Sequence, residues 1–415
     1  MDNCVWSKKA DFETIRHYFN ALNNDHGHFV NSNDICTPME CVKEMLDSVP
    51  EEFWERKDIK VLDSCCGNGN FHAYAATKTS LDNLCFNEIN EKRVYNLKKY
   101  FGEDINCTTK DFLTFDDTEE YDMVVSNPPY AMFNNGKRVS KNHNLARLFI
   151  QKAINITKPN GYILFIVPNN WMSFSDRNNL PNQLSRYQFI RLDINGAKKW
   201  FPKVGSSFTW FLLKKVPNNE AFEITNHYVL QDTQYAKLDK GVRFIPLYYS
   251  ETVRSIFNKT VNDANLTKYK IETSSNLHRF TKKEYLKTAC DDEYKYKIYH
   301  TPSQIVWSRI PHKYQEGFKV YLSLTNQYGT FIDENTGMTQ SIAFIRCKSK
   351  GEALKIKAEL DSEVYKFINN VTRYGNFNNI RVLQNLPLLS EIRLTEEENN
   401  FIREFNQKYY GKKEK

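Results

Sequence analysis

The segment Asn127-Pro128-Pro129-Tyr130 carries the side chains best suited to chemistry in this 415-residue chain. It follows a short apolar run, Met123 to Val125, that is typical of a buried strand end, and two consecutive prolines cannot continue a backbone hydrogen-bond ladder. There the Asn side chain offers an acceptor and two donors, the backbone offers carbonyl oxygens, and the Tyr offers a flat face. This set suits a planar base that carries an amino group. An ordinary strand-to-loop turn would also explain the prolines alone.

A second candidate segment, Lys60 to Phe71, reads as a strand, a turn of small residues and a helix start. The strand ends at Asp63, and the turn is Ser64-Cys65-Cys66-Gly67-Asn68-Gly69. Glycines permit a sharp bend and a close approach of a ligand to the backbone. The turn matches neither Gly-x-Gly-x-x-Gly nor a P-loop, so it does not indicate phosphate binding. Asp63 suits an ammonium group, such as that of S-adenosylmethionine, although a structural turn looks similar.

Two further acids stand where ligands bind in open α/β sheets. Glu88 follows the expected strand from Leu84 to Asn87, and an acid at this place can accept both hydroxyls of a ribose. Asp111-Phe112 lies in a loop before the next strand and suits an adenine amino group and ring face. A solvated loop Asp is the alternative interpretation of Asp111.

The elements that must position these residues alternate between strands and helices from residue 60 onward. This pattern predicts an α/β domain with a Rossmann-like, doubly wound, mostly parallel sheet. Upstream, Thr37-Pro38 predicts a helix start with Thr37 as N-cap and Pro38 at the first helical position. Downstream, segments 200–204 and 208–213 predict a β-hairpin near the domain end. We therefore expect a first domain of residues 1–216.

Residues 217–415 have shorter, mixed elements and predict a second domain of α+β type. They hold 30 Lys and Arg against 24 Asp and Glu, whereas residues 1–216 hold 27 against 26, so most of the net charge of +7 lies here. Basic and aromatic residues interleave from 268 to 314. Cations neutralise phosphates and rings stack on bases, so this domain suits nucleic acid, although an ordinary solvated surface is also compatible. The candidate contacts are Lys282, Lys283, Arg309, Lys313 and Arg373.

Composition disfavours several other classes of protein. No stretch approaches the roughly 20 apolar residues of a membrane span, and the first residues lack a signal-peptide pattern. The nine cysteines have no paired spacing except adjacent Cys65-Cys66, and no Cys/His set has zinc-ligand spacing. We therefore expect a soluble intracellular protein, cytoplasmic or associated with a nucleoid or a virus, with reduced thiols and no metal.

Together these motifs resemble the γ-class S-adenosylmethionine-dependent N6-adenine DNA methyltransferases of restriction-modification systems. In that family the cofactor motifs come first, Asn-Pro-Pro-Tyr second and a target-recognition domain last. The match covers about the first half of the chain at motif level and only the general layout beyond it. It implies S-adenosylmethionine as cofactor and duplex DNA as partner. A separately encoded cognate restriction endonuclease is a candidate partner whose existence the sequence leaves open, and we expect a monomer or weak dimer.

The resemblance implies roles for individual residues. Asn127, Pro128, Pro129 and Tyr130 would form the catalytic motif, in which Asn127 Oδ1 and the Pro128 carbonyl accept the N–H bonds of an adenine amino group. Tyr130 and Phe201 would stack on the flipped base, with Trp200 or Trp171 as alternatives to Phe201. The doubled cysteine departs from the family pattern. Cofactor contacts would come from Thr37, Pro38, Asp63, Cys65, Gly67, Asn68, Gly69, Phe71, Glu88, Asp111, Phe112 and Asn127.

Other activities share part of this pattern. Protein glutamine methyltransferases also use Asn-Pro-Pro-Tyr, because a side-chain amide presents the same planar amino group, but they end soon after the catalytic sheet. Here residues 217–415 remain, which favours nucleic acid. RNA adenine methylation stays open, and Ser126 leaves cytosine amino methylation as a minor alternative. A non-catalytic nucleic-acid-binding protein is disfavoured because every catalytic position is chemically intact.

Overall fold

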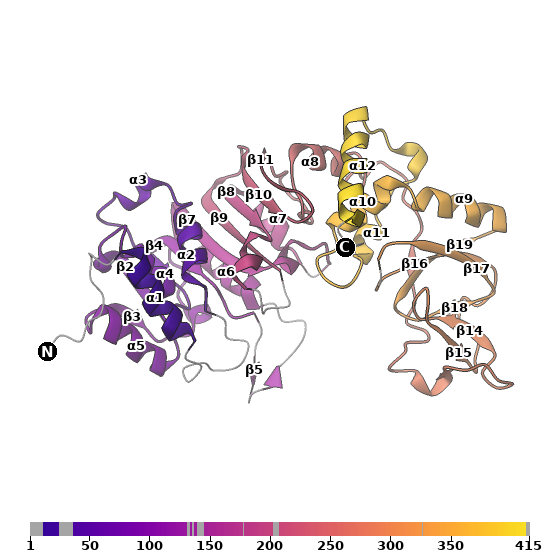
Figure 1. Cartoon of the computed structure of the whole chain (residues 1–415), viewed down its shortest axis with the longest axis horizontal. Coiled ribbons are helices and arrows are strands. Elements are labelled where there is room, and N and C mark those ends of the chain that lie inside the picture. Colours follow the sequence, from indigo (N-terminus) through magenta and orange to yellow (C-terminus); the bar gives the residue numbers. More distant parts are fainter. Residues whose placement is uncertain are drawn as a thin grey trace. The chain divides into compact units, whose positions relative to one another are not determined.

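The computed structural model describes residues 11–24, 36–130, 133–134, 137–138, 145–176, 178–201, 207–325 and 327–411. The chain divides into two compact units (Figure 1). Unit 1 comprises Met1–Trp171, Leu180–His227 and Asp232–Val242, and unit 2 comprises Met172–Asn179, Tyr228–Gln231 and Arg243–Lys415. Within the described ranges, no helix has the length and apolar character that a membrane span requires.

Unit 1 is built on a nine-stranded sheet with the order β11-β10-β8-β9-β7-β4-β1-β2-β3. Neighbouring strands from β3 to β7 are parallel, β10 is parallel to β8, and β9 runs antiparallel between β7 and β8. The sheet is therefore mostly parallel, as predicted. Its strands are β1 Val61–Asp63, β2 Leu84–Asn87, β3 Asn106–Thr108, β4 Tyr121–Ser126, β7 Thr157–Pro168, β8 Tyr187–Ile194, β9 Phe208–Pro217, β10 Phe222–His227 and β11 Gln231–Ala236.

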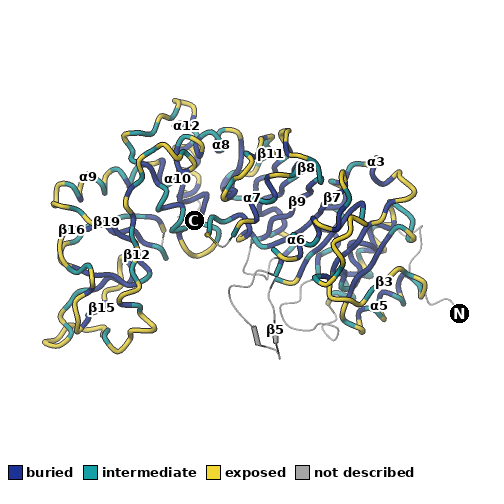
Figure 2. Tube along the Cα trace, turned by 180° about the vertical axis from the view of Figure 1, so that it is seen from behind, coloured by how far each residue is buried: buried dark blue, intermediate teal, exposed yellow. Residues whose placement is uncertain are grey.

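The central strands of this sheet are buried on both faces (Figure 2). Met123 and Val125 of β4 pack in one core cluster with residues of α1, α2, α4 and α5. Val124 points to the opposite face, because side chains alternate along a strand, and it is also fully buried. The helices of this unit are α1 Phe12–Asn23, α2 Met39–Leu46, α3 Glu51–Trp54, α4 Asn70–Ala75, α5 Glu91–Phe101, α6 Leu145–Ile156 and α7 Leu180–Leu184.

The predicted domain boundary at residue 216 was wrong. β10 and β11 follow β9 in the chain and extend the sheet next to β8, and unit 1 runs to Val242. Segment Met172–Asn179, which follows β7, instead belongs to unit 2. The two added strands lie at one edge of the sheet, where alternate residues of β10 are only partly buried. Their sequence therefore lacks the continuous apolar run that marks a central parallel strand.

Two local predictions near the strand ends are also corrected. α2 begins at Met39 with Pro38 as its N-cap residue, and the hydroxyl of Thr37 accepts a hydrogen bond from Asn127. Thr37 is therefore not the N-cap. The antiparallel pair that was expected near residues 200–213 is formed by β8 and β9, because Gly196–Trp200 is a short 3-10 helix, η5.

Unit 2 is of α+β type, as predicted, and contains two four-stranded sheets. Their orders are β12-β19-β16-β17 and β13-β15-β14-β18. The strands are β12 Glu272–Thr273, β13 Leu286–Lys287, β14 Tyr296–Tyr299, β15 Ile305–Ser308, β16 Phe318–Ser323, β17 Thr330–Glu334, β18 Gly337–Met338 and β19 Ile342–Cys347. The helices are α8 Glu251–Asn258, α9 Lys350–Leu360, α10 Glu363–Val371, α11 Ile380–Leu383 and α12 Glu396–Gly411. In unit 1, a separate ribbon pairs β5 Phe133–Asn134 with β6 Lys137–Arg138.

Candidate active site

Three strand ends meet at the carboxyl edge of the sheet in unit 1. β1 lies between β2 and β4 and is parallel to both, and Asp63 pairs in register with Phe86 and Val125. The turn after β1, Glu88 after β2 and Asn127 after β4 therefore share one edge. Open α/β sheets bind ligands at this edge.

The turn after β1 needs its glycines for backbone geometry and for packing. Gly67 and Gly69 have φ angles of +56° and +88°, a region that favours glycine. A Cβ on Gly69 would lie 2.7 Å from Leu97 Cδ2 and 2.8 Å from Phe101 Cε2 of α5. The Gly67 N–H donates to Glu88 Oε2 at 2.8 Å. The fold itself thus requires these glycines, beyond any need of a ligand.

Asp63 is a buried acid with one oxygen that no described group satisfies. Oδ1 accepts the backbone N–H of Cys65 at 3.4 Å, whereas Oδ2 has no hydrogen-bond partner among the described residues. Burial raises the pKa of Asp63 to about 8, the Cys65 N–H opposes this rise, and the charge of Glu88 adds to it. Buried polar atoms in folded proteins are normally hydrogen-bonded. An ammonium group would complete this site.

Glu88 is buried after β2, and each of its carboxylate oxygens accepts a backbone N–H. Oε2 accepts from Gly67 and Oε1 from Asn90, both at 2.8 Å, and Arg93 Nη1 lies 4.0 Å from Oε2. A carboxylate oxygen has a second lone pair, so hydroxyl donors can still be bound. The next residue, Ile89, is 68% exposed and was missed in the sequence. Its signal was an apolar residue directly after the acid at a strand end.

Two buried Asn side chains add acceptors to the same turn. Asn68 Nδ2 donates to Asn23 Oδ1 at 3.1 Å, and Asn70 Nδ2 donates to the Thr37 carbonyl oxygen at 2.7 Å. The Oδ1 atoms of Asn68 and Asn70 have no partner in the described parts of the chain. With Asp63 Oδ2, segment 63–70 thus holds three buried acceptors that a ligand could satisfy.

The amide of Asn127 is held at both ends. Nδ2 donates to Thr37 Oγ1 at 2.9 Å, and Oδ1 accepts from the Tyr130 hydroxyl. Burial raises the pKa of Tyr130 above its ordinary value, which keeps this hydroxyl protonated. Pro128 is buried and Pro129 is exposed. The structure therefore joins Thr37, Asn127 and Tyr130, which the sequence pattern assigned to separate tasks.

The two adjacent cysteines have different surroundings. Cys65 Sγ lies 3.0 Å from Ser126 Oγ and donates to the Asn127 carbonyl oxygen at 3.4 Å. Cys66 packs in the core, and its N–H donates to the Asn87 carbonyl oxygen at 2.9 Å. Burial raises the pKa of both thiols, so both stay protonated. Cys65 links the turn after β1 to the end of β4, a contact that the sequence did not reveal.

Three aromatic rings form a row beside the Asn-Pro-Pro-Tyr segment. The ring centroids of Tyr130 and Phe208 are 5.8 Å apart, and those of Phe208 and Phe201 are 4.9 Å apart. Phe201 and Phe208 are both buried. Phe208 was missed because it reads as the first residue of an apolar strand. Of the two alternatives to Phe201, Trp171 is 1% exposed and lies in the core, and Trp200 is the last residue of η5.

The remaining predicted cofactor residues divide into an exposed acid and two core rings. Asp111 is exposed and accepts the Leu113 N–H at 3.0 Å, which caps the 3-10 helix η3, Phe112–Thr114. The Phe112 ring is buried, with its centroid 5.1 Å from that of Phe149. Phe71 of α4 is also buried in the core. Both rings are therefore packed in the core in this conformation.

Comparisons with known proteins find a family match over the part of the chain that contains these strand ends. Residues 41–201 match the family of Eco57I restriction-modification methylases. The matched range contains the turn after β1, Glu88, Asn127 and Phe201. In unit 1 these residues lie on the mostly parallel nine-stranded sheet, in which β9 runs antiparallel between β7 and β8.

Individual proteins that are similar to this chain align with it over different lengths. Type II methyltransferase M.AccI from Acinetobacter calcoaceticus is 27% identical over 129 residues, which is 27% of this chain and 24% of that protein. The matched part thus spans about a quarter of the length of this curated relative. A cryo-EM structure of a DrdV–DNA complex aligns with a TM-score of 0.52 at 10% identity, over 88% of this chain and 55% of that one. The type IIG restriction endonuclease BpuSI aligns with a TM-score of 0.43 at 12% identity, over 95% and 63%.

The Eco57I match ends at residue 201, and the predicted basic residues lie beyond it, in several segments of unit 2. Lys282, Lys283 and Arg309 are exposed and gather around Tyr285. Lys282 Nζ and the Arg309 guanidinium lie 5.8 Å and 4.8 Å from the Tyr285 ring centroid, and Lys283 is the first residue of the short 3-10 helix Lys283–Tyr285. We call these three residues the basic cluster.

The other two predicted basic residues do not share that arrangement. Lys313 is exposed, and its Nζ lies 5.2 Å from the Tyr314 ring centroid. Arg373 Nη2 donates to the carbonyl oxygens of Thr325 at 3.3 Å and Asn376 at 2.9 Å. The Arg373 side chain therefore joins its own loop to the segment that follows β16.

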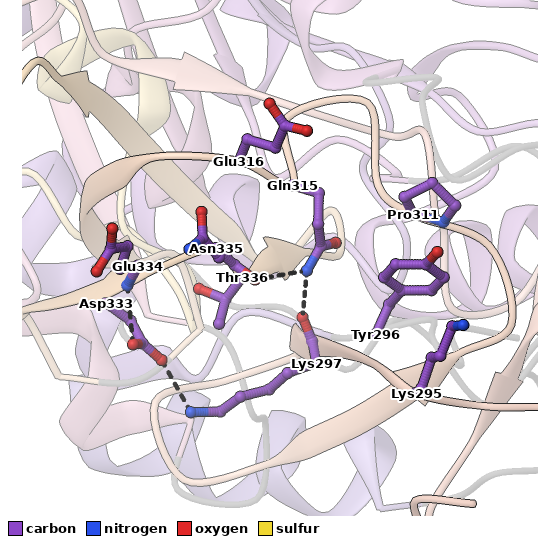
Figure 3. A pocket seen from close by; sticks show the side chains of 10 residues that line it. All are labelled: Lys295, Tyr296, Lys297, Pro311, Gln315, Glu316, Asp333, Glu334, Asn335 and Thr336. Carbon is purple, nitrogen blue, oxygen red and sulfur yellow. Dashed lines mark hydrogen bonds and ion pairs between the residues drawn. The ribbon is translucent and has the colours of Figure 1, made fainter. Parts of the chain in front are cut away.

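Unit 2 also contains a pocket of about 570 Å³ (Figure 3). Lys297 Nζ pairs with Asp333 Oδ2 at 2.8 Å, and Gln315 Nε2 donates to the Asn335 carbonyl oxygen at 2.7 Å. Its principal polar groups thus bind one another. The pocket lies outside the range that matches the Eco57I methylases, and we assign it no part in the chemistry. It is lined by Lys295, Tyr296, Lys297, Pro311, Gln315, Glu316, Asp333, Glu334, Asn335 and Thr336.

Proposed function

We propose that this protein is a site-specific DNA methyltransferase that transfers a methyl group from S-adenosylmethionine to N6 of an adenine flipped out of duplex DNA. The observation that carries the proposal is the Asn127-Pro128 strand end beside two buried acids, Asp63 and Glu88, at the carboxyl edge of a class I methyltransferase sheet. The match to Eco57I restriction-modification methylases and to M.AccI supports the same class of reaction.

The buried polar groups at this edge fit S-adenosylmethionine. Asp63 Oδ2, which no described group satisfies, accepts the ammonium group, and the Glu88 carboxylate accepts the ribose hydroxyls. Ile89 offers an apolar face to the adenine ring, and Asp111 accepts its amino group. When bound, the cofactor supplies an electrophilic methyl group. The wall of this site comprises Thr37, Pro38, Cys65, Gly67, Asn68, Gly69, Phe71 and Phe112.

Asn127 and Pro128 position the target nitrogen. The lone pair of an adenine amino group is conjugated with the ring, so the nitrogen is a poor nucleophile. Two acceptors, Asn127 Oδ1 and the Pro128 carbonyl oxygen, bind its two N–H groups and hold the nitrogen closer to tetrahedral geometry. They also stabilise the positive charge that develops on the nitrogen. This arrangement needs no covalent enzyme intermediate.

The aromatic row receives the flipped base. Chemistry on a base inside a duplex requires that the base leave the stack. Tyr130 stacks on one face of the adenine and Phe201 on the other, and stacking in an apolar site offsets part of the cost of unpairing. Because the buried Phe208 ring contacts both Tyr130 and Phe201, entry of the base between those two rings requires Phe208 to move aside.

The basic cluster of unit 2 binds the phosphates of duplex DNA. Lys282, Lys283 and Arg309 are exposed and lie next to the paired strands β13 and β15 in sequence. Phe280, which is 73% exposed, precedes the two lysines in sequence. Phosphate contacts of this kind supply affinity that falls with salt concentration. Lys313 and Arg373 provide further contacts, and Arg373 must first leave the carbonyl oxygens that it now binds.

Expression in a host that lacks DNA methylation tests this function. We expect sequencing of the host DNA to find N6-methyladenine at one recurrent site, and none when Asn127→Ala is expressed. Methylation confined to cytosine would overturn the choice of base, and methylation confined to RNA or to protein glutamine would overturn the choice of substrate. If a separately encoded endonuclease cuts the same site, DNA from this host should resist that nuclease.

A further inference from the structure

We propose that Thr37 is a positioning residue that sets the orientation of the Asn127 amide, so that Oδ1 and not Nδ2 faces the target amino group. This inference rests on the proposed function and assigns Thr37 a task beyond contact with the methionine part of the cofactor. Thr37 and Asn127 are 90 residues apart in sequence, and their side chains are joined by a 2.9 Å hydrogen bond.

The need for such a residue follows from the symmetry of the amide group. The oxygen and the nitrogen of an Asn side chain have nearly the same shape, and a rotation of about 180° exchanges an acceptor for a donor. An adenine amino group requires the acceptor. A flipped Asn127 would present two N–H groups to the two N–H groups of the substrate, which is a repulsive contact. Catalysis therefore requires that one orientation be selected before the base arrives.

The two partners of the amide select that orientation together. Thr37 Oγ1 accepts from Nδ2, and the Tyr130 hydroxyl donates to Oδ1. A phenol is a stronger hydrogen-bond donor than an aliphatic hydroxyl, so the reverse arrangement, with Thr37 donating and Tyr130 accepting, is less favourable. Tyr130 leaves or shares Oδ1 when the base enters, and the hydrogen bond to Thr37 then maintains the orientation.

Thr37 is itself fixed from two sides. It is buried, and its carbonyl oxygen accepts from Asn70 Nδ2 at 2.7 Å, which ties it to the start of α4. Pro38 follows and restricts the backbone at the start of α2. Asn127 is held as well, because Cys65 Sγ donates to its backbone carbonyl oxygen at 3.4 Å. The hydroxyl and the amide therefore meet between two braced backbone segments.

Thr37→Val tests the inference, because Val replaces the hydroxyl by a methyl group of similar size. We expect kcat for adenine methylation at saturating S-adenosylmethionine to fall by about tenfold or more, because a misoriented acceptor raises the barrier. Thr37→Ser keeps the hydroxyl and should retain kcat within about threefold. Thr260→Val is the matched control, since this buried hydroxyl in unit 2 only donates to the Ile256 carbonyl of its own helix.

The kinetic result separates positioning from cofactor binding. If Thr37→Val only raises the KM for S-adenosylmethionine and kcat recovers at saturation, Thr37 is a cofactor anchor and the inference is wrong. If Thr37→Val does not fold, Thr37→Ala takes its place and must show the same loss of kcat. Equal loss in Thr37→Ser would also overturn the inference, because the hydroxyl would then be irrelevant.

A second readout does not depend on methyl transfer. In protein labelled with ¹⁵N-asparagine, the side-chain NH₂ signals of Asn127 are those that vanish in Asn127→Ala. We expect Thr37→Val to shift them and Thr37→Ser to leave them nearly in place. Unshifted signals in Thr37→Val would overturn the hydrogen bond. If the variants show these shifts but the wild-type protein methylates no adenine, the proposed function fails while the Thr37–Asn127 contact stands.

Discussion

The Glu88 carboxylate accepts the backbone N–H of Gly67 at 2.8 Å and so joins the end of β2 to the glycine turn after β1. A single side chain thereby shapes the turn at the edge where we propose that the cofactor binds. We expect Glu88→Ala to weaken S-adenosylmethionine binding by at least about tenfold in calorimetric titration, a loss of about 1.4 kcal/mol. Glu103→Ala, which removes an exposed acid that pairs with Lys98 at 3.4 Å, is the control. Equal cofactor affinity in wild type and Glu88→Ala would contradict the assignment.

Asp63 should make the stability of the protein depend on pH. Its folded-state pKa of about 8 lies above the ordinary value of 3.8, so the folded protein retains a proton that the unfolded chain has lost within this window. Stability therefore falls as pH rises from about 4 to 8, by up to about 1.4 kcal/mol per pH unit, and levels off above.

Asp63→Asn removes this titration. We expect its Tm to exceed that of wild type by a margin that grows between pH 5 and pH 8, while its affinity for S-adenosylmethionine falls. Thermal melts across this pH range check the first expectation and titration calorimetry the second. Parallel Tm curves for the two proteins would show that Asp63 does not titrate in this window.

Asn127→Ala separates catalysis from cofactor binding. We expect methylation to fall by at least about a hundredfold, because one of two acceptors for the target amino group is lost. S-Adenosylmethionine affinity should change by less than about threefold. A methyl-transfer assay and a binding titration on the same preparation measure both. The control is Asn155→Ala, which replaces an exposed Asn of α6, and retained methylation in Asn127→Ala would refute the catalytic role.

Gly69→Ala tests whether packing or backbone geometry explains the glycine turn. A Cβ at Gly69 would lie 2.7 Å from Leu97 Cδ2 at a φ of +88°, whereas Gly102, with a φ of +113°, has nothing within 4 Å of such an atom. Gly69→Ala and Gly102→Ala both place a side chain at positive φ, which costs on the order of 1–3 kcal/mol. Only Gly69→Ala also overpacks the core, at a further 1–3 kcal/mol or so. Denaturant unfolding should show this difference, and equal losses would assign the whole effect to φ.

Charge reversal at Lys282 and Lys283 tests the basic cluster. We expect the double variant Lys282→Glu/Lys283→Glu to bind DNA more weakly and to show a shallower dependence of affinity on salt, by about one unit of slope per lost phosphate contact. Fluorescence anisotropy at several salt concentrations measures both. Lys348→Glu/Lys350→Glu makes the same charge change at exposed positions around the start of α9. An unaltered slope in the first variant would move the DNA surface elsewhere.

Much of unit 1 could be predicted because its signals are local. The apolar runs of β1, β2 and β4 each end at a polar residue or a proline, so the order of Asp63, Glu88 and Asn127 along the chain could be read directly. The alternation of these strands with amphipathic helices predicts a parallel sheet, and parallel strands bring their carboxyl ends to one edge. The expected α+β character of the second half was confirmed for the same reason.

The contacts between these segments could be decided only by tertiary structure. Cys65 approaches Ser126 because β1 and β4 are neighbours in register. The Thr37 hydroxyl accepts from Asn127 because the start of α2 lies next to the end of β4. Nothing in the spacing of Thr37 predicts a partner 90 residues away, and its place before Pro38 instead resembles a helix cap. Residue type and local spacing determine which groups stand at a strand end. Strand register and packing determine which of those groups meet, because hydrogen bonds depend on distances that the linear sequence does not contain.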